Sequence, residues 1–371
     1  MRTVRRLLYR DIIWSVVFVS VAFLSLFYFI DFVDELEGIG RNNYTALHAA
    51  ASAALELPGH FYELAPICVL IGTIYSMARL AQSSEYTILR TGGLGPVRAL
   101  SLLAALGLFF GAITFLIGDY VAPLSEREAV LLKASFRGGL QLGRGGAWLK
   151  ERRTGPEGER SISVNVQRTA SDAELQGIRI YELDTDGRLR TRIEAKSGRV
   201  DAQSVWLLQG VERTDWPTPE QAAQGAAVAV QRPVTMQWPS SLSAAVVAAA
   251  VLPVSTMSTV ELYRYSAHLG DQEQASQRHE IQFWKKALYP FACLVMVALA
   301  LPFAYLHARA GGVSLKVFGG IMLGISFVLL NNVSGHLGML RDWAPWVAAA
   351  APGMVYLAMS LAAFTWLVRF R

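Results

Sequence analysis

Long uncharged apolar stretches dominate both ends of the chain. A helix needs about 20 apolar residues to cross about 30 Å of hydrocarbon, so windows near that length predict membrane spans. Six such windows occur, at residues 12–30, 64–78, 99–118, 287–306, 317–340 and 343–368. The second is the shortest, and it extends backwards past Glu63 to about residue 57. The pattern predicts a polytopic α-helical membrane protein with six transmembrane helices.

A different pattern occupies the middle of the chain. From Gly146 to about Trp238, short alternation of apolar and polar residues, bounded by turn residues, indicates strands. The clearest pair is joined by Asp184-Thr-Asp-Gly187, where glycine supplies the positive φ that a hairpin turn requires. Strands are predicted at 161–167, 178–183, 189–195, 204–211 and 227–237. This spacing predicts an inserted antiparallel sandwich or β-jelly roll over about 140–250.

Further segments set the domain organisation. Helices are predicted at 123–136 and 260–286, where they extend the third and fourth spans, and at 44–57, where Pro58-Gly59 is expected to end a surface helix. Residues 242–254 are too short to cross a membrane and are expected to form a strand or a surface segment. The predicted domains are therefore 1–123 with three spans, 124–280 with the inserted domain, and 281–371 with three more spans.

Composition and charge agree with this organisation. Hydrophobic residues make up 53% of the chain and charged residues 17%, against about 25% charged in soluble domains, which excludes a soluble enzyme or a disordered chain. The net charge of +5 does not indicate nucleic acid, because the bases form no stripe interleaved with aromatic residues. The excess of basic residues instead indicates how the chain is oriented in the membrane, because cytoplasmic loops are enriched in Lys and Arg. The bases on the side of the two termini are Arg2, Arg5, Arg6, Arg10, Arg79, Arg90, Arg98, Arg309, Lys316, Arg369 and Arg371, against Arg41 and Arg341 in the opposite short loops. Both termini are therefore predicted to be cytoplasmic and the inserted domain to lie outside.

Motifs for several kinds of chemistry are absent from the sequence. No Lys follows a Gly, so the chain has no G-x-x-x-x-G-K phosphate loop and is not itself a P-loop ATPase. His279-Glu280 lacks the second His of a zinc protease, and the centres of all six windows are uncharged, which argues against a carboxylate relay. Cys68 and Cys293 lie in apolar windows and are expected to be small buried side chains rather than a redox pair. No catalytic residue, metal or cofactor is predicted for this chain.

The loop between the second and third spans contains a candidate docking element. Residues 79–93 predict a short cytoplasmic helix at about 83–91, which a serine at 83 or 84 can cap and two glycines end. Glu85 complements the helix dipole in the first turn, and Tyr86 and Leu89 share a face at i, i+3. One acid and two apolar groups suit the groove of another protein. A helix that lies on the inner membrane surface is the alternative.

The same segment carries a resemblance to a known family. The run Glu63-Leu-Ala-Pro66, followed by Arg79-Leu-Ala-Gln-Ser-Ser-Glu85 and Leu89-Arg90, resembles the LptF/LptG family of permeases, which export lipopolysaccharide from the inner membrane of Gram-negative bacteria. Further matches follow in order over nearly the whole chain: Asp119-Tyr-Val-Ala-Pro123, Gly145-Gly-Ala-Trp148, Gly177-Ile-Arg-Ile-Tyr181 and Trp284-Lys-Lys-Ala-Leu-Tyr-Pro290. The run before Glu85, and Trp148, are more similar to the LptG branch of the family than to the LptF branch.

The resemblance implies a fold, a location and a set of partners. It implies six helices in the bacterial inner membrane and a periplasmic jelly-roll domain. The implied partners are an LptF-like permease, two LptB-like ATPase subunits that use ATP and Mg²⁺, and LptC-like and LptA-like periplasmic jelly-roll proteins. The implied cargo is lipopolysaccharide, and this chain would be a transport subunit rather than an enzyme. The short cytoplasmic helix would dock on the ATPase through Glu85, Tyr86, Leu89 and Arg90.

An anionic cargo requires bases at the outer membrane surface. Lys133, Arg137, Lys285 and Lys286 are expected there, and the last two lie where the positive-inside rule disfavours Lys. They are therefore candidates for phosphate contacts, and Lys133 matches a basic position of the LptG branch. The alternative is that bases in a long exported segment are uninformative. The resemblance would place another base at the outer end of the first span, but this chain has Asp31, so that contact is not carried over.

The sequence therefore predicts the permease subunit of a lipopolysaccharide ABC exporter. Two alternatives stay open beside it: the LptF paralogue of the same complex, and an autonomous secondary lipid transporter. A purely structural scaffold is a third.

Overall fold

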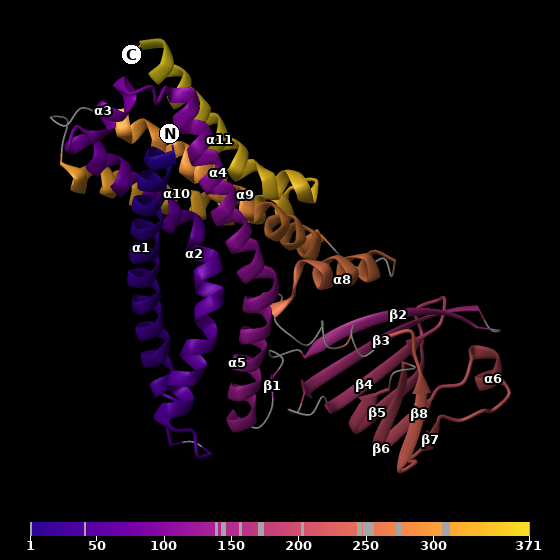
Figure 1. The fold of residues 1–371 in the computed structure, drawn as a ribbon. Coiled ribbons are helices and arrows are strands. Elements are labelled where there is room, and N and C mark those ends of the chain that lie inside the picture. Colours follow the sequence, from indigo (N-terminus) through magenta and orange to yellow (C-terminus); the bar gives the residue numbers. More distant parts are fainter. Residues whose placement is uncertain are drawn as a thin grey trace. The chain divides into compact units, whose positions relative to one another are not determined.

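The computed structural model describes residues 2–40, 42–137, 140–141, 146–155, 158–169, 174–201, 204–242, 247, 256–271, 277–305 and 312–370. The chain divides into two compact units (Figure 1). The helical unit comprises Met1–Glu35, Ala53–Ser125 and Gln277–Arg371. The second unit, which contains the β-sheet, comprises Leu36–Ser52 and Glu126–Ser276.

Six helices among the described residues are long and apolar enough to cross a membrane, which confirms the predicted number of spans. The long helices are α1 (Arg2–Leu36), α2 (Ala46–Gln82), α4 (Pro96–Leu116), α9 (Gln277–Tyr305), α10 (Val313–Leu340) and α11 (Pro345–Phe370). The chain leaves α4 through a π-helical turn, η1 (Ile117–Val121), and continues into α5 (Ala122–Arg137), so the third span is extended as predicted. A short helix, α3 (Glu85–Thr91), lies between α2 and α4.

Helix α2 corrects one expectation. The sequence predicts a separate helix at 44–57 that ends at Pro58-Gly59, but α2 runs without a break through both Pro58 and Pro66. A proline removes one backbone hydrogen bond and kinks the preceding turn, and spans tolerate this because packing against neighbouring helices maintains the helix. Helix α2 has that packing, since 78% of its most apolar window is buried, the largest share among the six candidate spans.

Small residues allow close contacts between helices in the helical unit. A Cβ atom on Gly72 would lie 2.7 Å from the backbone of Val16, and one on Gly107 would lie 2.9 Å from the Cα of Leu294. Close approach of helix backbones at small residues is a main source of association energy in membranes. Cys68 and Cys293 are both free and buried in this unit, which confirms them as small buried side chains.

The inserted β domain is confirmed as an antiparallel sheet. Its strands are β1 (Leu140–Gln141), β2 (Ala147–Gly155), β3 (Gly158–Thr169), β4 (Leu175–Leu183), β5 (Leu189–Val200), β6 (Val205–Asp215), β7 (Ala229–Gln231) and β8 (Thr235–Pro239). Strands β2 to β6 pair with their neighbours in sequence, and β7 and β8 both pair with β6. The β4–β5 turn is the predicted hairpin, with Gly187 at φ +75° and the Asp184 carboxylate accepting from the backbone N–H groups of Asp186 and Arg188.

The predicted strand at 227–237 is two strands instead of one. Residues 232–234 separate β7 from β8, and Pro233 has no N–H group to donate to a sheet ladder. Its carbonyl still accepts from the N–H of Val211. A short helix, α6 (Pro219–Ala223), precedes β7. Most of the segment 242–254, expected to be a strand or a surface segment, lies outside the described residues.

The core of the β domain comes from alternate residues of its strands. Trp206 is fully buried, lies edge-on to Trp238 with ring centroids 5.8 Å apart, and donates through its indole N–H to the carbonyl of Leu242. Two buried carboxylates accompany them, and one of them, Glu182, accepts from the indole N–H of Trp238. Glu151 accepts from the hydroxyl of Ser240 and pairs with Arg153 at 3.1 Å, so its charge is compensated.

An ion pair joins the helices of the second unit. Arg127 on α5 donates to Glu261 on α8 (Thr259–Asp271) at 2.6 Å. Burial acts to raise the pKa of the Glu261 carboxyl, but hydrogen bonds from Arg127 and Ser258 outweigh it and lower this pKa below the ordinary value. Between α8 and α9, residues 272–276 are outside the described residues, so the predicted single helix at 260–286 is described only as these two helices.

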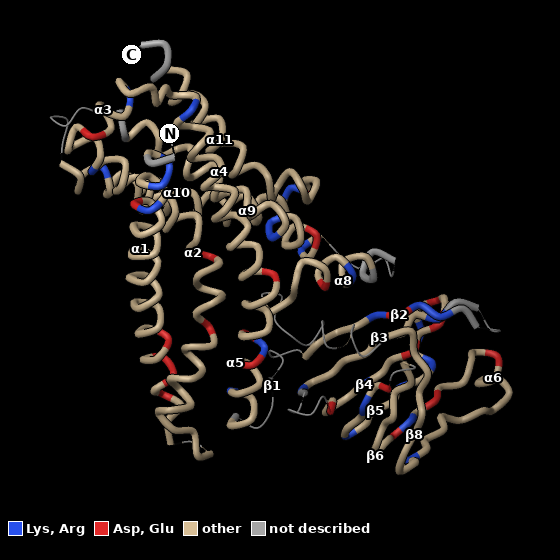
Figure 2. The backbone as a smooth tube through the Cα atoms, viewed as in Figure 1, with Lys and Arg blue, Asp and Glu red and all other residues tan. Residues whose placement is uncertain are grey.

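Charges are distributed unevenly between the elements. Figure 2 shows Lys, Arg, Asp and Glu scattered over the strands of the β domain but sparse along α4, α10 and α11. Charged groups are costly in hydrocarbon, so this distribution agrees with helices that cross a bilayer.

Candidate functional site

The candidate docking helix, α3, has seven residues, and its two ends differ in how well they are capped. Ser84 precedes it in the left-handed region at φ 61° and makes no side-chain cap hydrogen bond, so the predicted serine cap is wrong. The carboxyl end has the predicted glycines. Gly93 adopts φ +100°, its N–H donates to the carbonyl of Arg90, and the N–H of Leu94 donates to that of Leu89, which is the Schellman pattern.

The helix α3 presents a different face from the one expected. Tyr86 is only 3% exposed and lies in the same apolar core as Leu80 and Leu94, and Leu89 packs against that core. Both side chains therefore anchor α3 to the helical unit instead of being exposed for a partner. Residues three positions apart share a face, so the exposed side chains of Glu85 and Ile88 lie together on the opposite side.

We call Glu85, Ile88 and Thr91 the outer face of α3. All three are exposed, and Ile88, at 67%, is the large apolar residue among them. Arg90, which is also exposed, lies in the last turn, where a cation complements the helix dipole. The arrangement can offer one acid and one apolar group to a partner on a firmly anchored helix.

The four predicted phosphate-binding bases belong to different compact units. Lys133 is half-buried on α5, and the side chain of Arg137 is outside the described residues. Lys285 and Lys286 lie on α9 in the helical unit. The Nζ atom of Lys285 donates to the carbonyl of Asn331 at 2.9 Å, and that of Lys286 lies 5.9 Å from the ring of Tyr62. The ammonium groups of Lys285 and Lys286 therefore lie against different helices, α10 and α2.

Lys285 borders a cavity of about 160 Å³ between α9, α10 and α11. Apart from Lys285 and Asn331, its lining is apolar or aromatic and includes Tyr289, Phe327 and Met354. A cavity with one ammonium group and a largely apolar wall suits an amphipathic molecule. The sequence indicated Lys285, but it gave no sign that α10 and α11 would complete the cavity.

A larger cavity, of about 430 Å³, is bordered by α1, α2 and α10. It is lined by Asp11, Trp14, Ser15, Phe18, Val19, Ile71, Tyr75, Arg79 and Val317. Asp11 and Arg79 form an ion pair of 2.7 Å across it. Arg79, which the sequence analysis counted only as a basic residue that favours one orientation, therefore also has a structural partner.

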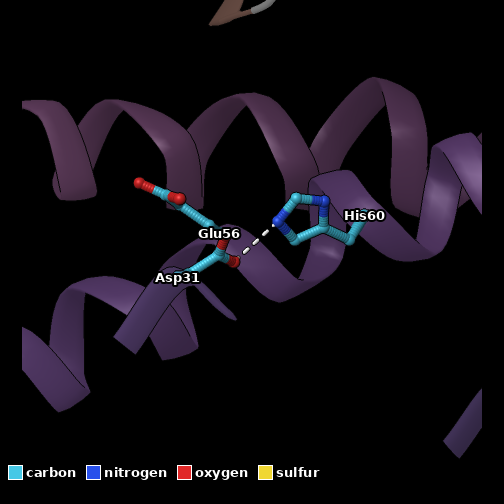
Figure 3. A group of neighbouring side chains, drawn as sticks. All are labelled: Asp31, Glu56 and His60. Carbon is cyan, nitrogen blue, oxygen red and sulfur yellow. Dashed lines mark hydrogen bonds and ion pairs between the residues drawn. The ribbon is translucent and has the colours of Figure 1, made fainter. Parts of the chain in front are cut away.

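Near the carboxyl end of α1 lies a group of three titratable side chains (Figure 3). Asp31, where the family resemblance would place a base, contacts His60 of α2 with 2.7 Å between Oδ2 and Nε2. Glu56 belongs to the same group, and one potential ligand atom from each residue lies within 4.8 Å of the other two. The sequence hypotheses did not include this group.

Comparisons with known proteins agree with the described fold. The family model described as lipopolysaccharide export system permease LptF/LptG matches residues 6–366. The chain is 26% identical over 341 residues to the lipopolysaccharide export system permease protein LptG of Escherichia coli (strain K12), with 91% of each chain covered. It is 22% identical over 360 residues to the protein of the same name from Haemophilus influenzae, with 96% of each covered. Since the family model matches nearly the whole chain, the chain belongs to the LptF/LptG family of lipopolysaccharide export permeases.

Proposed function

We propose that the chain is the LptG-type transmembrane subunit of an ABC exporter that extracts lipopolysaccharide from the inner membrane and passes it to a periplasmic bridge. The observation that carries this is the family match over residues 6–366, together with relatives named LptG. ATP hydrolysis with Mg²⁺ would belong to two separate LptB-like subunits, because the sequence has no phosphate loop. An LptF-like permease and LptC-like and LptA-like periplasmic proteins would complete the assembly.

The outer face of α3 supports docking of the ATPase. Glu85 is exposed in the first turn, and Ile88 is exposed beside it. A charge-assisted contact at the rim and a buried apolar contact beside it are the usual parts of a specific interface. Tyr86 and Leu89 would couple α3 to the other helices, because their packing into the core would transmit movement of the ATPase to the helical unit.

Co-purification tests this proposal most directly. We expect the wild-type chain, solubilised from its own membranes, to retain an ATPase, a second permease and lipopolysaccharide. The variant Glu85→Lys should lose the ATPase while keeping the second permease, since reversal of one charge at a docked contact costs several kcal/mol, about as much as truncation of a paired charge. Glu220→Lys is the matched control, because Glu220 also lies in the first turn of a short exposed helix, but in the β domain. Equal ATPase retention by both variants would refute docking through Glu85.

We propose further that both termini are cytoplasmic and that the β domain is periplasmic. The distribution of short-loop bases supports this orientation. A membrane-impermeant thiol reagent added to spheroplasts should label Thr185→Cys in the β4–β5 turn but not Ser83→Cys. Both positions are exposed, and the native Cys68 and Cys293 are buried and should contribute little background. Labelling of Ser83→Cys but not of Thr185→Cys would show that the orientation is the reverse of the proposed one.

The cavity beside Lys285 supports an amphipathic cargo. Its apolar lining suits acyl chains, and the ammonium group of Lys285 at its border suits a phosphate. Lys286, on the same helix, is proposed as a further phosphate contact. Lys133 and Arg137 are proposed as further phosphate contacts on their own helix, α5.

Two alternatives have distinct outcomes in the same experiments. Retention of a second permease that is itself the better LptG match would assign this chain as the LptF paralogue. An autonomous secondary transporter is favoured by one observation, the ionisable group formed by Asp31, Glu56 and His60 within helices that can span the membrane. Lipid transport by the purified single chain under an ion gradient, without ATPase, would support that alternative.

A further inference from the structure

The cavity of about 430 Å³ between α1, α2 and α10 has a polar end and an apolar end. Its main lining from α1 consists of residues three or four positions apart, which share one helix face: Asp11, Trp14, Ser15 and Phe18. Its lining from α2 repeats every four residues: Ile71, Tyr75 and Arg79. At a rise of 1.5 Å per residue, Phe18 and Ile71 lie roughly 10–12 Å along the helices from the Asp11–Arg79 ion pair. We call this amphipathic cavity the α1–α2 groove.

The polar end of the α1–α2 groove lies at the edge of the hydrocarbon. Asp11 directly precedes the uncharged run 12–30, and Arg79 directly follows the run 64–78. Trp14 and Tyr75 lie about one turn further in, and these residue types are enriched at the interface between membrane and water. Trp14 and Phe18 are 68% and 75% exposed, so the surroundings of α1 have access to the groove. A molecule in the groove would therefore have its polar group at the membrane surface and its apolar part in hydrocarbon.

The Asp11–Arg79 ion pair retains hydrogen-bonding capacity on both sides. A guanidinium has five N–H donors, and a carboxylate has about four acceptor positions. Among the described residues, the side chain of Arg79 donates only to Oδ2 of Asp11, at 2.7 Å, and Oδ1 of Asp11 accepts from none of them. The remaining N–H groups of Arg79 suit a phosphate, and the remaining oxygen of Asp11 suits a primary ammonium group. A headgroup that carries both charges fits, whereas one with a phosphate alone would put two anions beside one guanidinium.

We propose that the α1–α2 groove binds one phospholipid of the phosphatidylethanolamine class. Its phosphate accepts from Arg79, its ammonium donates to Asp11, and one acyl chain lies along Phe18 and Ile71. The volume of the groove is within the range of about 300–1,000 Å³ that is typical of small-molecule sites. This lipid site is separate from the cavity beside Lys285, because three spans separate Asp11 from Lys285 along the chain and the two residues therefore lie at opposite membrane surfaces.

Native mass spectrometry of the full-length chain in detergent tests the headgroup. Phosphatidylethanolamine and phosphatidylglycerol with the same acyl chains compete for the chain. We expect the wild type to retain one phosphatidylethanolamine and to prefer it over phosphatidylglycerol by a factor of about five or more. Asp11→Asn preserves the size of the side chain but removes the charge that faces the ammonium, so this variant should lose the preference. Equal retention of the two lipids by the wild type would overturn the proposal.

A variant that fills the groove tests the location. Val19 lines the groove, and Val21, on the same helix, is 55% exposed and does not line it. Val19→Trp should lose most of the bound phosphatidylethanolamine, and Val21→Trp, the matched control, should retain it like the wild type. Both variants keep Asp11 and Arg79, so a difference between them does not arise from a broken ion pair. Equal lipid retention by these two variants would refute the assignment to the groove.

Photo-crosslinking identifies the occupant in native membranes. A photo-crosslinking residue at Phe18 should capture phosphatidylethanolamine in a higher ratio to phosphatidylglycerol than the same residue at Val21, which reports the surrounding bilayer. An identical ratio at the two positions would contradict the proposal. Capture of lipopolysaccharide at Phe18 would make the groove part of the cargo route, and capture of another protein would make it a subunit interface; either result would also overturn the proposal.

Discussion

The outer face of α3 leads to a prediction that separates docking from anchoring. Ile88 is 67% exposed in the chain alone. Complete burial of an isoleucine side chain contributes about 1.5–3 kcal/mol, so covering the exposed two thirds should contribute roughly 1–2 kcal/mol to binding of an ATPase. Each 1.4 kcal/mol changes affinity about tenfold, so Ile88→Ala should weaken binding roughly 5- to 30-fold. Stability of the free chain should change by about 0.5 kcal/mol or less, as expected for a surface position.

Truncation of Tyr86, unlike that of Ile88, should lower the stability of the free chain. It is buried in the core of the helical unit, and truncation of a buried aromatic side chain to alanine costs about 3–5 kcal/mol. Tyr86→Ala should therefore lower the thermal unfolding midpoint and release α3, and ATPase binding should fall as a consequence. Tyr86→Phe keeps the ring and should preserve both properties.

The assay combines two measurements on the same samples. The full-length chain is reconstituted in lipid nanodiscs, binding of the purified ATPase is measured by surface plasmon resonance, and unfolding is followed by tryptophan fluorescence. Val234→Ala is the control for Ile88→Ala, because Val234 is 82% exposed but lies in the β domain. If Ile88→Ala binds the ATPase as tightly as Val234→Ala does, the outer face of α3 is not the docking surface.

Three further outcomes are expected from the described contacts. The lowered pKa of Glu261 means that its ion pair with Arg127 stabilises the fold above the ordinary carboxyl pKa of 4.5, and this contribution is lost as the pH falls through the lowered value. The pair is partly exposed, so the difference in unfolding midpoint between wild type and Glu261→Gln should be small at pH 7 and should disappear at acidic pH; a difference that grows on acidification would contradict this. Trp206→Ala removes a fully buried indole from the β domain and should cost about 3–5 kcal/mol, measured as faster proteolysis within residues 146–242. A photo-crosslinking residue at Lys286 should capture lipopolysaccharide in native membranes, and capture of phospholipid alone would make Lys286 an ordinary interfacial anchor.

The local sequence pattern was sufficient to predict those elements whose structure is determined within one short segment. The six spans follow from uninterrupted apolar length, and the β4–β5 hairpin follows from Gly187 between two alternating segments. Both are features that a short window of sequence specifies completely. The β domain was predictable as antiparallel for the same reason, because its strands are short and closely spaced.

Tertiary packing decided the features that the sequence could not supply. Pro58 was expected to end a helix, but α2 continues through both Pro58 and Pro66, and its most apolar window is mostly buried. Tyr86 and Leu89 share a face as predicted, but the direction of that face depends on where α3 meets the core. The contact between Asp31 and His60 joins residues 29 positions apart, so it depends on the relative rotation of α1 and α2. The only sequence signal was an acidic residue where the family resemblance would place a base.

Contacts at both ends of α1 and α2 suggest how movement at α3 would reach the membrane. Asp11 pairs with Arg79 near the α3 end of α2, and Asp31 contacts His60 toward the opposite end. Between these contacts, the two helices approach closely at Gly72, where a Cβ atom would lie 2.7 Å from the backbone of Val16. The two helices are therefore expected to move as one body. Only 11% of the most apolar window of α1 is buried, so the exposed face of this body is largely apolar. In the proposed complex, a displacement of α3, transmitted through α2, would consequently move this apolar surface against the lipid or the proposed second permease.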